Sequence, residues 1–261
     1  MYRIMAVTLS LGMIAATVGG ETDPRFTAAL QTNYSGSHVD LYTQQQDRIR
    51  TLIHEAPIEI SSQLGLLQYQ EGFRCPLTVR FDDTPAAGVE HALAYVKIIP
   101  TVHGIGQDLV INLDVMATTH DDFDQIFYHE MTHAVLNDAV VFGTRKPLPS
   151  WVQEGLAVYI AGNGDDWVKH QAQRVRKSQA HELVRDIEEP VLDYPRNYLA
   201  FKYLKEKHGI NSLQAFVRDL TQGKTPQESI EDSTGLPWDT FRQNLKEYSL
   251  SVYQDNARSD F

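Results

Sequence analysis

At the centre of the chain stands the pentapeptide His129-Glu130-Met131-Thr132-His133, which has the pattern H-E-x-x-H. If this segment is helical, its two histidines are one turn apart and project from the same face. Two neutral imidazoles in that arrangement can fill two positions of a tetrahedral zinc site. Glu130 is rotated from them by about a quarter turn. Its carboxylate would therefore lie beside the metal without being a ligand, where a general base for hydrolysis is needed.

The residues around the pentapeptide predict that it belongs to a helix from Thr119 to about Asn137. Four apolar residues spaced four apart form a stripe that would face the core, namely Phe123, Phe127, Met131 and Val135. Thr119 followed three residues later by Asp122 resembles a capping box, which predicts the start of the helix.

A zinc site with two histidines is incomplete, so we expect a third ligand on another rigid element. The stretch W-V-Q-E-G-L-A over residues 151–157 supplies Glu154. Ser150 and Gln153 have the spacing of a second capping box, which places Glu154 in the first turns of a new helix. Gly155 lacks a side chain and so allows a second helix to approach closely.

Together the two motifs resemble those of the gluzincin class of zinc metallopeptidases, in particular the small bacterial peptidase-MA-like families. Those families carry H-E-x-x-H on one helix and W-x-x-E-G-x-A on the next, and both patterns are complete here. The resemblance implies that Zn²⁺ is bound by His129, His133 and Glu154. It further implies that Glu130 is the catalytic base.

Downstream the likeness is looser, although it extends over about residues 40–250. The stretch Y-P-R-N-Y over residues 194–198 is similar to the next helix of those families. Gluzincins add a donor to the oxyanion, and the resemblance points first to Tyr194 and second to Tyr198; core or surface tyrosines are the alternative. Thermolysin-like peptidases usually carry Asp one turn after the third ligand, where this chain has Val158. A hydrogen-bond partner for the ligand imidazoles must therefore come from elsewhere.

The order of the remaining elements predicts an α+β fold, with a small N-terminal sheet over the active-site helix and a mostly helical C-terminal half. Strands are expected at Leu77–Phe81, Ala92–Ile99 and Leu109–Leu113, with a turn around Gly104 and Gly106. Helices are expected over residues 42–68 with an interruption at Pro57, 150–160, 165–185, 195–208, 211–221, 226–233 and 238–252. Strand 109–113 could form the edge of the cleft and pair with an extended substrate.

The N-terminus has the pattern of a secretory signal peptide. Residues 1–20 combine a positive start, an apolar run and small residues near a plausible cut, and residues 21–38 form a polar leader. We expect a secreted or periplasmic protein, with an uncleaved membrane anchor as the alternative. The remainder, 39–261, would be one zincin-like domain, with the metal site in an α+β part (39–160) and a helical part (161–261).

The amino-acid composition limits the classes of partner that the protein is expected to bind. The net charge is −11 and the chain has no basic block, which argues against nucleic acid and anionic membrane surfaces. Cys75 is the sole cysteine, expected as a small buried residue rather than a catalytic thiol. The histidines outside the motif show no ligand spacing, and surface or structural roles are expected for His38, His54, His91, His103, His120, His170, His181 and His208.

The two motifs predict a zinc-dependent hydrolase. The resemblance implies that it is a peptidase that acts on peptide or protein substrates. The alternative from a different class is a catalytically silent protein on a peptidase fold, with a binding or assembly role in the cell envelope. The oligomeric state, the choice between endo- and exo-action, and a pro-segment role for residues 21–38 stay open.

Overall fold

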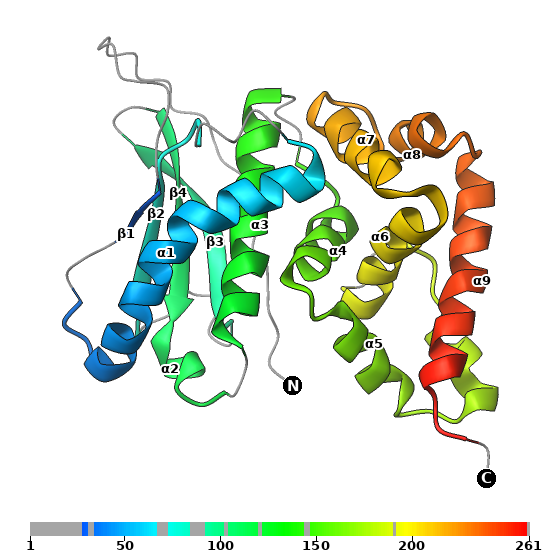
Figure 1. The fold of residues 1–261 in the computed structure, drawn as a ribbon, viewed down its shortest axis with the longest axis horizontal. Helices are drawn as coiled ribbons and strands as arrows, with labels where there is room; N and C mark the ends of the chain where they lie inside the picture. The colour runs from blue at the N-terminus through cyan, green and yellow to red at the C-terminus, as the bar shows by residue number, and fades with distance from the viewer. Residues whose placement is uncertain are drawn as a thin grey trace. The chain divides into compact units, whose positions relative to one another are not determined.

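The computed structural model describes residues 28–30, 34–66, 73–83, 92–101, 104–119, 122–143, 147–189 and 192–259. The predicted signal peptide, 1–20, and much of the predicted leader lie outside these residues. The chain divides into two compact units, of which unit 1 comprises Met1–Ser62 and Leu67–Asp138, and unit 2 comprises Gln63–Leu66 and Ala139–Phe261. The sheet belongs to unit 1 and most of the helices to unit 2, so the predicted α+β class is confirmed (Figure 1). The subdivision at residue 160 stays a prediction.

The sheet of unit 1 has four strands in the order β1-β2-β4-β3. The strands are β1 (Ala29–Leu30), β2 (Leu77–Asp82), β3 (Ala94–Thr101) and β4 (Gly104–Asn112). β4 pairs in parallel with β2 and antiparallel with β3. The glycines expected in a turn, Gly104 and Gly106, instead begin β4, whose pairing with β3 starts at Thr101 and Gly104.

The proposal that strand 109–113 forms an edge is wrong, because β4 is hydrogen-bonded on both sides. Its residues Leu109–Ile111 are almost fully buried, as expected of a central strand covered on both faces. An apolar run identifies such a strand, but only the pairing shows which strand is outermost. In the described sheet the outer strand next to β4 is β3.

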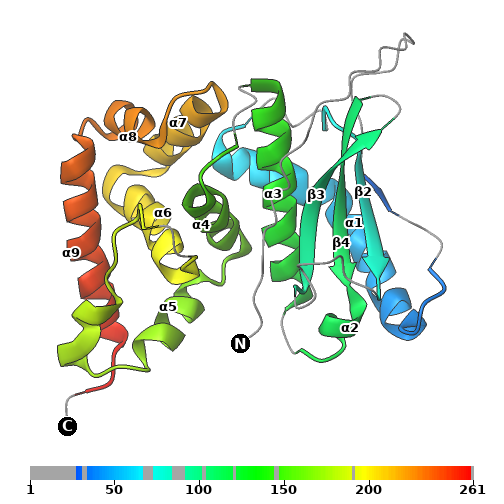
Figure 2. The same cartoon turned by 180° about the vertical axis from the view of Figure 1, so that it is seen from behind.

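Helix α1 (Val39–Leu64) lies across one face of the sheet in Figure 1, and the strands lie in front of it in the reverse view of Figure 2. The expected interruption at Pro57 is wrong, since the helix continues through this residue. Its apolar side is fully buried on both sides of the proline, at Leu52, Ala56, Ile60 and Leu64. This burial offsets the cost of about 3 kcal/mol for an internal proline.

The H-E-x-x-H motif lies on α3 (Phe123–Gly143), which follows the short α2 (Leu113–Met116). The predicted capping box is wrong, because the Thr119 hydroxyl donates to the Met116 carbonyl. Asp122 caps the helix instead by accepting the backbone N–H of Asp124 at 2.9 Å. A Thr and an Asp three residues apart fit two alternative local geometries, so their spacing alone did not place the first turn.

Unit 2 is helical. Its elements are α4 (Ser150–Ala161), α5 (Gly164–Ala172), the 3₁₀ helix η2 (Lys177–Leu183), α6 (Tyr194–His208), α7 (Ile210–Thr221), α8 (Pro226–Thr234) and α9 (Trp238–Asn256). The single helix expected over 165–185 is therefore two elements. The backbone between them bonds to the end of the chain, with Lys177 N–H to Arg258 O at 2.9 Å and Arg258 N–H to Val175 O at 3.2 Å. Groups used in this way cannot continue an α-helix.

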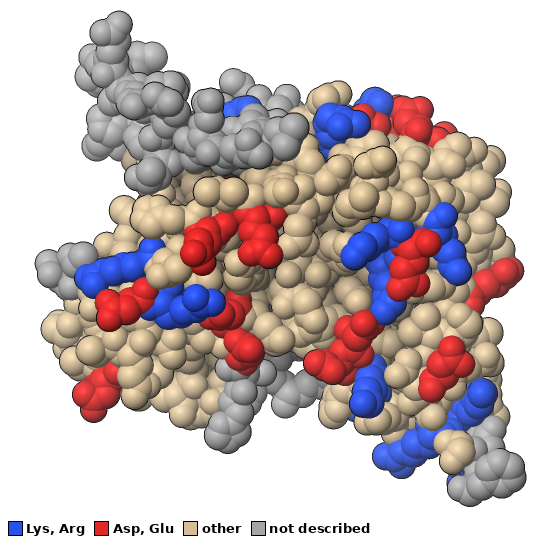
Figure 3. Space-filling model, in the orientation of Figure 1, with Lys and Arg blue, Asp and Glu red and all other residues tan. Residues whose placement is uncertain are grey.

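No helix of the described residues is long and apolar enough to cross a membrane. On the face drawn in Figure 3, basic and acidic side chains are interspersed, and the described residues form no extended basic patch there.

Candidate metal centre

Helix α3 is held in unit 1 by polar contacts along its length. Near its start, Asp124 pairs with the guanidinium of Arg48 on α1, and the Tyr128 hydroxyl donates to Glu59 at 2.6 Å. Further along, the Ala134 carbonyl accepts from the Gln107 side chain of β4 at 3.1 Å. These contacts fix the rotation of α3 about its axis, and therefore the direction in which the motif points.

The buried carboxylate of Asp138 makes the last of these contacts. It accepts the backbone N–H groups of Arg74 and Cys75, the latter at 2.6 Å, where the chain enters β2. Cys75 is buried, as predicted. Burial, together with the nearby charge of Asp138, raises the pKa of its thiol to about 12.

The two histidines of the motif converge. The Nε2 atoms of His129 and His133 lie 3.2 Å apart, and both side chains are almost fully buried. In a tetrahedral zinc site with Zn–N bonds of about 2.0–2.1 Å, two ligand nitrogens are separated by roughly 3.3 Å. The observed spacing thus fits a pair of imidazoles that share one ion. Glu130, between them in sequence, is equally buried.

Glu154 lies in the first turns of α4, as predicted, and is also almost fully buried. The predicted capping box there is wrong, because Pro149 is the N-cap residue and no side chain caps the helix. The Gln153 amide instead donates to the Leu148 carbonyl at 2.8 Å. A proline ahead of the helix fixes the backbone entry without needing a side-chain cap.

Gly155 allows the close approach that was predicted for it. A Cβ at this position would lie 2.5 Å from the Asn197 carbonyl oxygen and 2.5 Å from a ring carbon of Phe201, both on α6. Trp151 stacks on the Phe201 ring with centroids 5.7 Å apart. Glu154 is thus carried by a helix packed directly against α6.

His129, His133 and Glu154 each offer one ligand atom, and these atoms lie within 4.8 Å of one another. The group could therefore hold a metal ion. Two imidazole nitrogens and one carboxylate oxygen are one of the donor sets found in catalytic zinc sites with three protein ligands. Val158, one turn after Glu154, belongs to an apolar cluster and supplies no hydrogen bond to a ligand.

The two candidate oxyanion donors differ in their surroundings. The Tyr198 hydroxyl donates to Asp165 at 3.0 Å, and its ring belongs to the buried apolar cluster of unit 2. Burial, followed by the charge of Asp165, raises the pKa of Tyr198. Tyr194 is half-buried, and its ring meets Trp167 of α5 edge-to-face with centroids 4.8 Å apart. Nothing in the sequence motifs pointed to Asp165 or Trp167, because neither belongs to a recognisable spacing.

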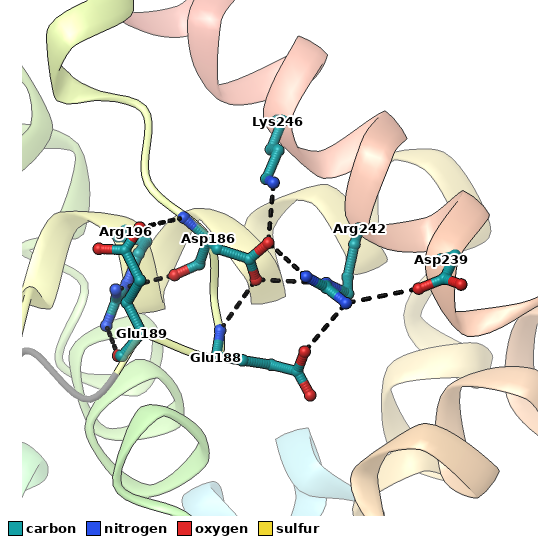
Figure 4. A network of polar contacts seen from close by, with 7 residues as sticks. All are labelled: Asp186, Glu188, Glu189, Arg196, Asp239, Arg242 and Lys246. Atoms are coloured by element: carbon teal, nitrogen blue, oxygen red, sulfur yellow. Dashed lines mark hydrogen bonds and ion pairs between the residues drawn. The ribbon is translucent and has the colours of Figure 1, made fainter.

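The segment ahead of α6 is tied to α9 by a charged network (Figure 4). The Asp186 carboxylate binds Arg242 at 2.5 Å and Lys246 at 2.7 Å. On the α6 side, the buried Arg196 donates to the backbone carbonyls of Asp186 and Glu189 at 2.9 and 3.3 Å. This double attachment holds the start of α6, where the first candidate tyrosine lies.

Comparison with known proteins agrees with this geometry at the level of the family. A family model of the Peptidase MA superfamily matches residues 109–250, more than half of the chain. The match includes both metal motifs and ends within α9. No curated protein and no solved structure matches the chain.

Proposed function

Since the chain belongs to the Peptidase MA superfamily, we propose that it is a zinc-dependent peptidase of the gluzincin type. The observation that carries the proposal is the pair of buried Nε2 atoms 3.2 Å apart on one helix face, with a buried carboxylate oxygen within 4.8 Å. A hydrolytic role also requires a general base beside the three ligands. We assign this role to Glu130, which directly follows the ligand His129 on α3.

In this proposal His129, His133 and Glu154 hold Zn²⁺. When bound, the ion supplies a Lewis acid and lowers the pKa of a coordinated water from about 16 to near 7. Three protein ligands leave one position open for water or substrate, which distinguishes a catalytic site from a closed structural one.

Glu130 acts as the general base. Its carboxylate takes a proton from the attacking water and then delivers that proton to the amine that leaves. Only 2% of Glu130 is exposed, so bulk water competes little for the proton during this transfer. A carboxylate that both accepts and donates one proton suits amide hydrolysis, because the amine is a poor leaving group until it is protonated.

Tyr194 is the first candidate for donating a hydrogen bond to the oxyanion, and Tyr198 is the second. The family resemblance gives this order, and in the structure the Tyr198 hydroxyl donates to Asp165 at 3.0 Å. Peptides and proteins are the substrates that the family membership favours.

The direct test is Glu130→Gln, which keeps the size and polarity of the side chain but removes the base. The zinc content measured by mass spectrometry should equal that of the wild type, while kcat on a peptide library falls by a factor of about 10² or more. Glu182→Gln changes an exposed glutamate of η2 and serves as the control, with activity expected to be unchanged.

Retained cleavage by Glu130→Gln would remove this residue as the base. A wild-type chain that binds zinc but cleaves nothing in the library would favour the alternative, a catalytically silent binding or assembly protein of the cell envelope.

We also propose export to the periplasm or the medium, on the basis of residues 1–20. Cell fractionation with N-terminal sequencing tests this, since a mature protein that begins near residue 21 requires cleavage of the signal. An intact N-terminus in the membrane fraction would indicate an anchor instead.

A further inference from the structure

A second group of metal-ligating side chains lies in unit 1, apart from the H-E-x-x-H motif. It consists of His38, just before α1, Asp83, just after β2, and Asp114 on α2. Each offers one ligand atom, and these atoms lie within 4.8 Å of one another. Both views place the start of α1 at the same end of the sheet as α2 (Figures 1 and 2).

Asp83 is oriented by donors from the segment that leads into α1. The Ser37 backbone N–H and hydroxyl donate to its Oδ2 at 2.6 and 2.9 Å, and the Tyr34 hydroxyl donates to its Oδ1. Gly36 makes room for this carboxylate, since a Cβ there would clash with it. A carboxylate has about four acceptor sites, so these three bonds orient Asp83 and leave a lone pair for a further partner.

The group has two carboxylates and one imidazole. The His38 Nε2 and Asp114 Oδ1 atoms lie 2.8 Å apart. In the part of the chain that the structure describes, no Lys or Arg forms an ion pair with Asp83 or Asp114. Two carboxylates held this close repel each other unless a cation lies between them, and an imidazole provides only one proton.

We propose that His38, Asp83 and Asp114 form a second, structural site for a divalent transition-metal ion of the Zn²⁺ class. An imidazole nitrogen favours zinc over Ca²⁺ or Mg²⁺, which take oxygen ligands. The side chains of His38 and Asp114 are 29% and 55% exposed, which gives the ion access and lets water complete its coordination. The ion links α1, β2 and α2, three segments far apart in sequence, and stabilises unit 1 by mass action.

The proposal is tested by titrating Zn²⁺ into the chelator-treated full chain and measuring the number of bound equivalents by calorimetry. The wild type should bind two equivalents, and His38→Gln should bind one. The glutamine amide can still donate to Asp114, so this variant keeps the hydrogen bond and loses the nitrogen ligand. His54→Gln changes an exposed histidine of α1 outside both groups and should keep two equivalents.

The double variant His129→Ala/His133→Ala separates this site from the proposed catalytic one. In that background Zn²⁺ should still bind one equivalent and raise the unfolding temperature, and adding His38→Gln or Asp114→Asn should abolish both effects. A His38→Gln variant that binds as much Zn²⁺ as the wild type, or a His129→Ala/His133→Ala double variant that binds none, would overturn the second site. Loss of zinc binding from the H-E-x-x-H motif alone would contradict the proposed function and leave this result intact.

Discussion

The Nε2 atoms of His129 and His133 lie 3.2 Å apart, with the two rings inclined at 76°. A separation of four residues on a helix brings two side chains to the same face, but rotamers decide whether their nitrogens converge. Here they converge, on a helix held by contacts to α1, β4 and the entry to β2.

Metal removal should destabilise the protein as well as stop cleavage. An ion that binds only the folded chain adds about 4 kcal/mol of stability when it is present at a thousand times its Kd. We expect a chelator to lower the unfolding temperature of His38→Gln, in which only the H-E-x-x-H site remains, and Zn²⁺ to restore it. Identical melting curves with chelator and with Zn²⁺ would show that the ion does not bind there.

Substitution of the two tyrosines by phenylalanine should have different consequences. Tyr198→Phe loses the bond to Asp165, so we expect a loss of about 1 kcal/mol in the free energy of unfolding with little change in kcat. Tyr194→Phe should lower kcat by a factor of about 10². Chemical denaturation and steady-state kinetics on both variants measure this, and the reverse pattern would exchange the two roles.

Gly155→Ala should destabilise the chain, although alanine is the better helix former by about 1 kcal/mol. The added methyl would lie 2.5 Å from the Asn197 carbonyl oxygen, which is backbone and cannot rotate away. Overpacking of this kind costs about 1–3 kcal/mol and would displace Glu154, so zinc affinity should fall too. A higher unfolding temperature would mean that helix propensity outweighs the contact between α4 and α6.

Asp186→Asn should weaken the network of Figure 4 in a pH-dependent way. Although burial opposes it, Arg242 and Lys246 lower the pKa of Asp186 in the folded state. The stability that this carboxylate contributes is therefore complete above its unfolded pKa of 3.8 and is lost as the pH falls through the lower, folded value.

At neutral pH we expect Asp186→Asn to cost about 1–3 kcal/mol, with the difference from the wild type shrinking in acid. Asp239→Asn is the matched control, because Asp239 contacts the same Arg242 but its side chain is 92% exposed. It should change the stability by less than about 1 kcal/mol. If urea titrations show equal losses in the free energy of unfolding for the two variants, Asp186 does not contribute more than the exposed Asp239.

The Cys75 thiol should be unreactive in the folded protein. Its pKa is raised to about 12 by burial and by Asp138, so almost no thiolate exists at pH 8. A disulfide reagent should label it slowly in buffer and rapidly in denaturant, which makes the thiol a reporter of unfolding at the entry to β2. Rapid labelling of the folded chain would show that the segment at the entry to β2 opens and exposes the Cys75 thiol.

Much of the local structure follows from the sequence, because the patterns concerned are themselves local. The alternation over Leu77–Phe81 predicts β2, and the apolar stripe through Phe127 and Met131 predicts α3. The spacing within H-E-x-x-H is enough to place two imidazoles on one face. Glu154 could be identified as well, because its motif carries a glycine for close packing and follows a proline that starts a helix.

What the sequence left open depends on contacts between residues far apart in the chain. Pro57 stays helical because the apolar face around it is buried, and Tyr198 bonds to Asp165, 33 residues away. The central position of β4 follows from pairing on both sides. The group at His38 joins residues from three elements with no common spacing.

The sequence by itself therefore determined that His129 and His133 share one face of α3, because helical periodicity places residues four apart on the same side. Only the tertiary structure decided their surroundings, including the strand next to α3, the partner of each tyrosine and the second group of ligands in unit 1. The physical reason is that burial and hydrogen bonding are satisfied by whichever partner the fold brings near, and sequence distance does not limit that choice.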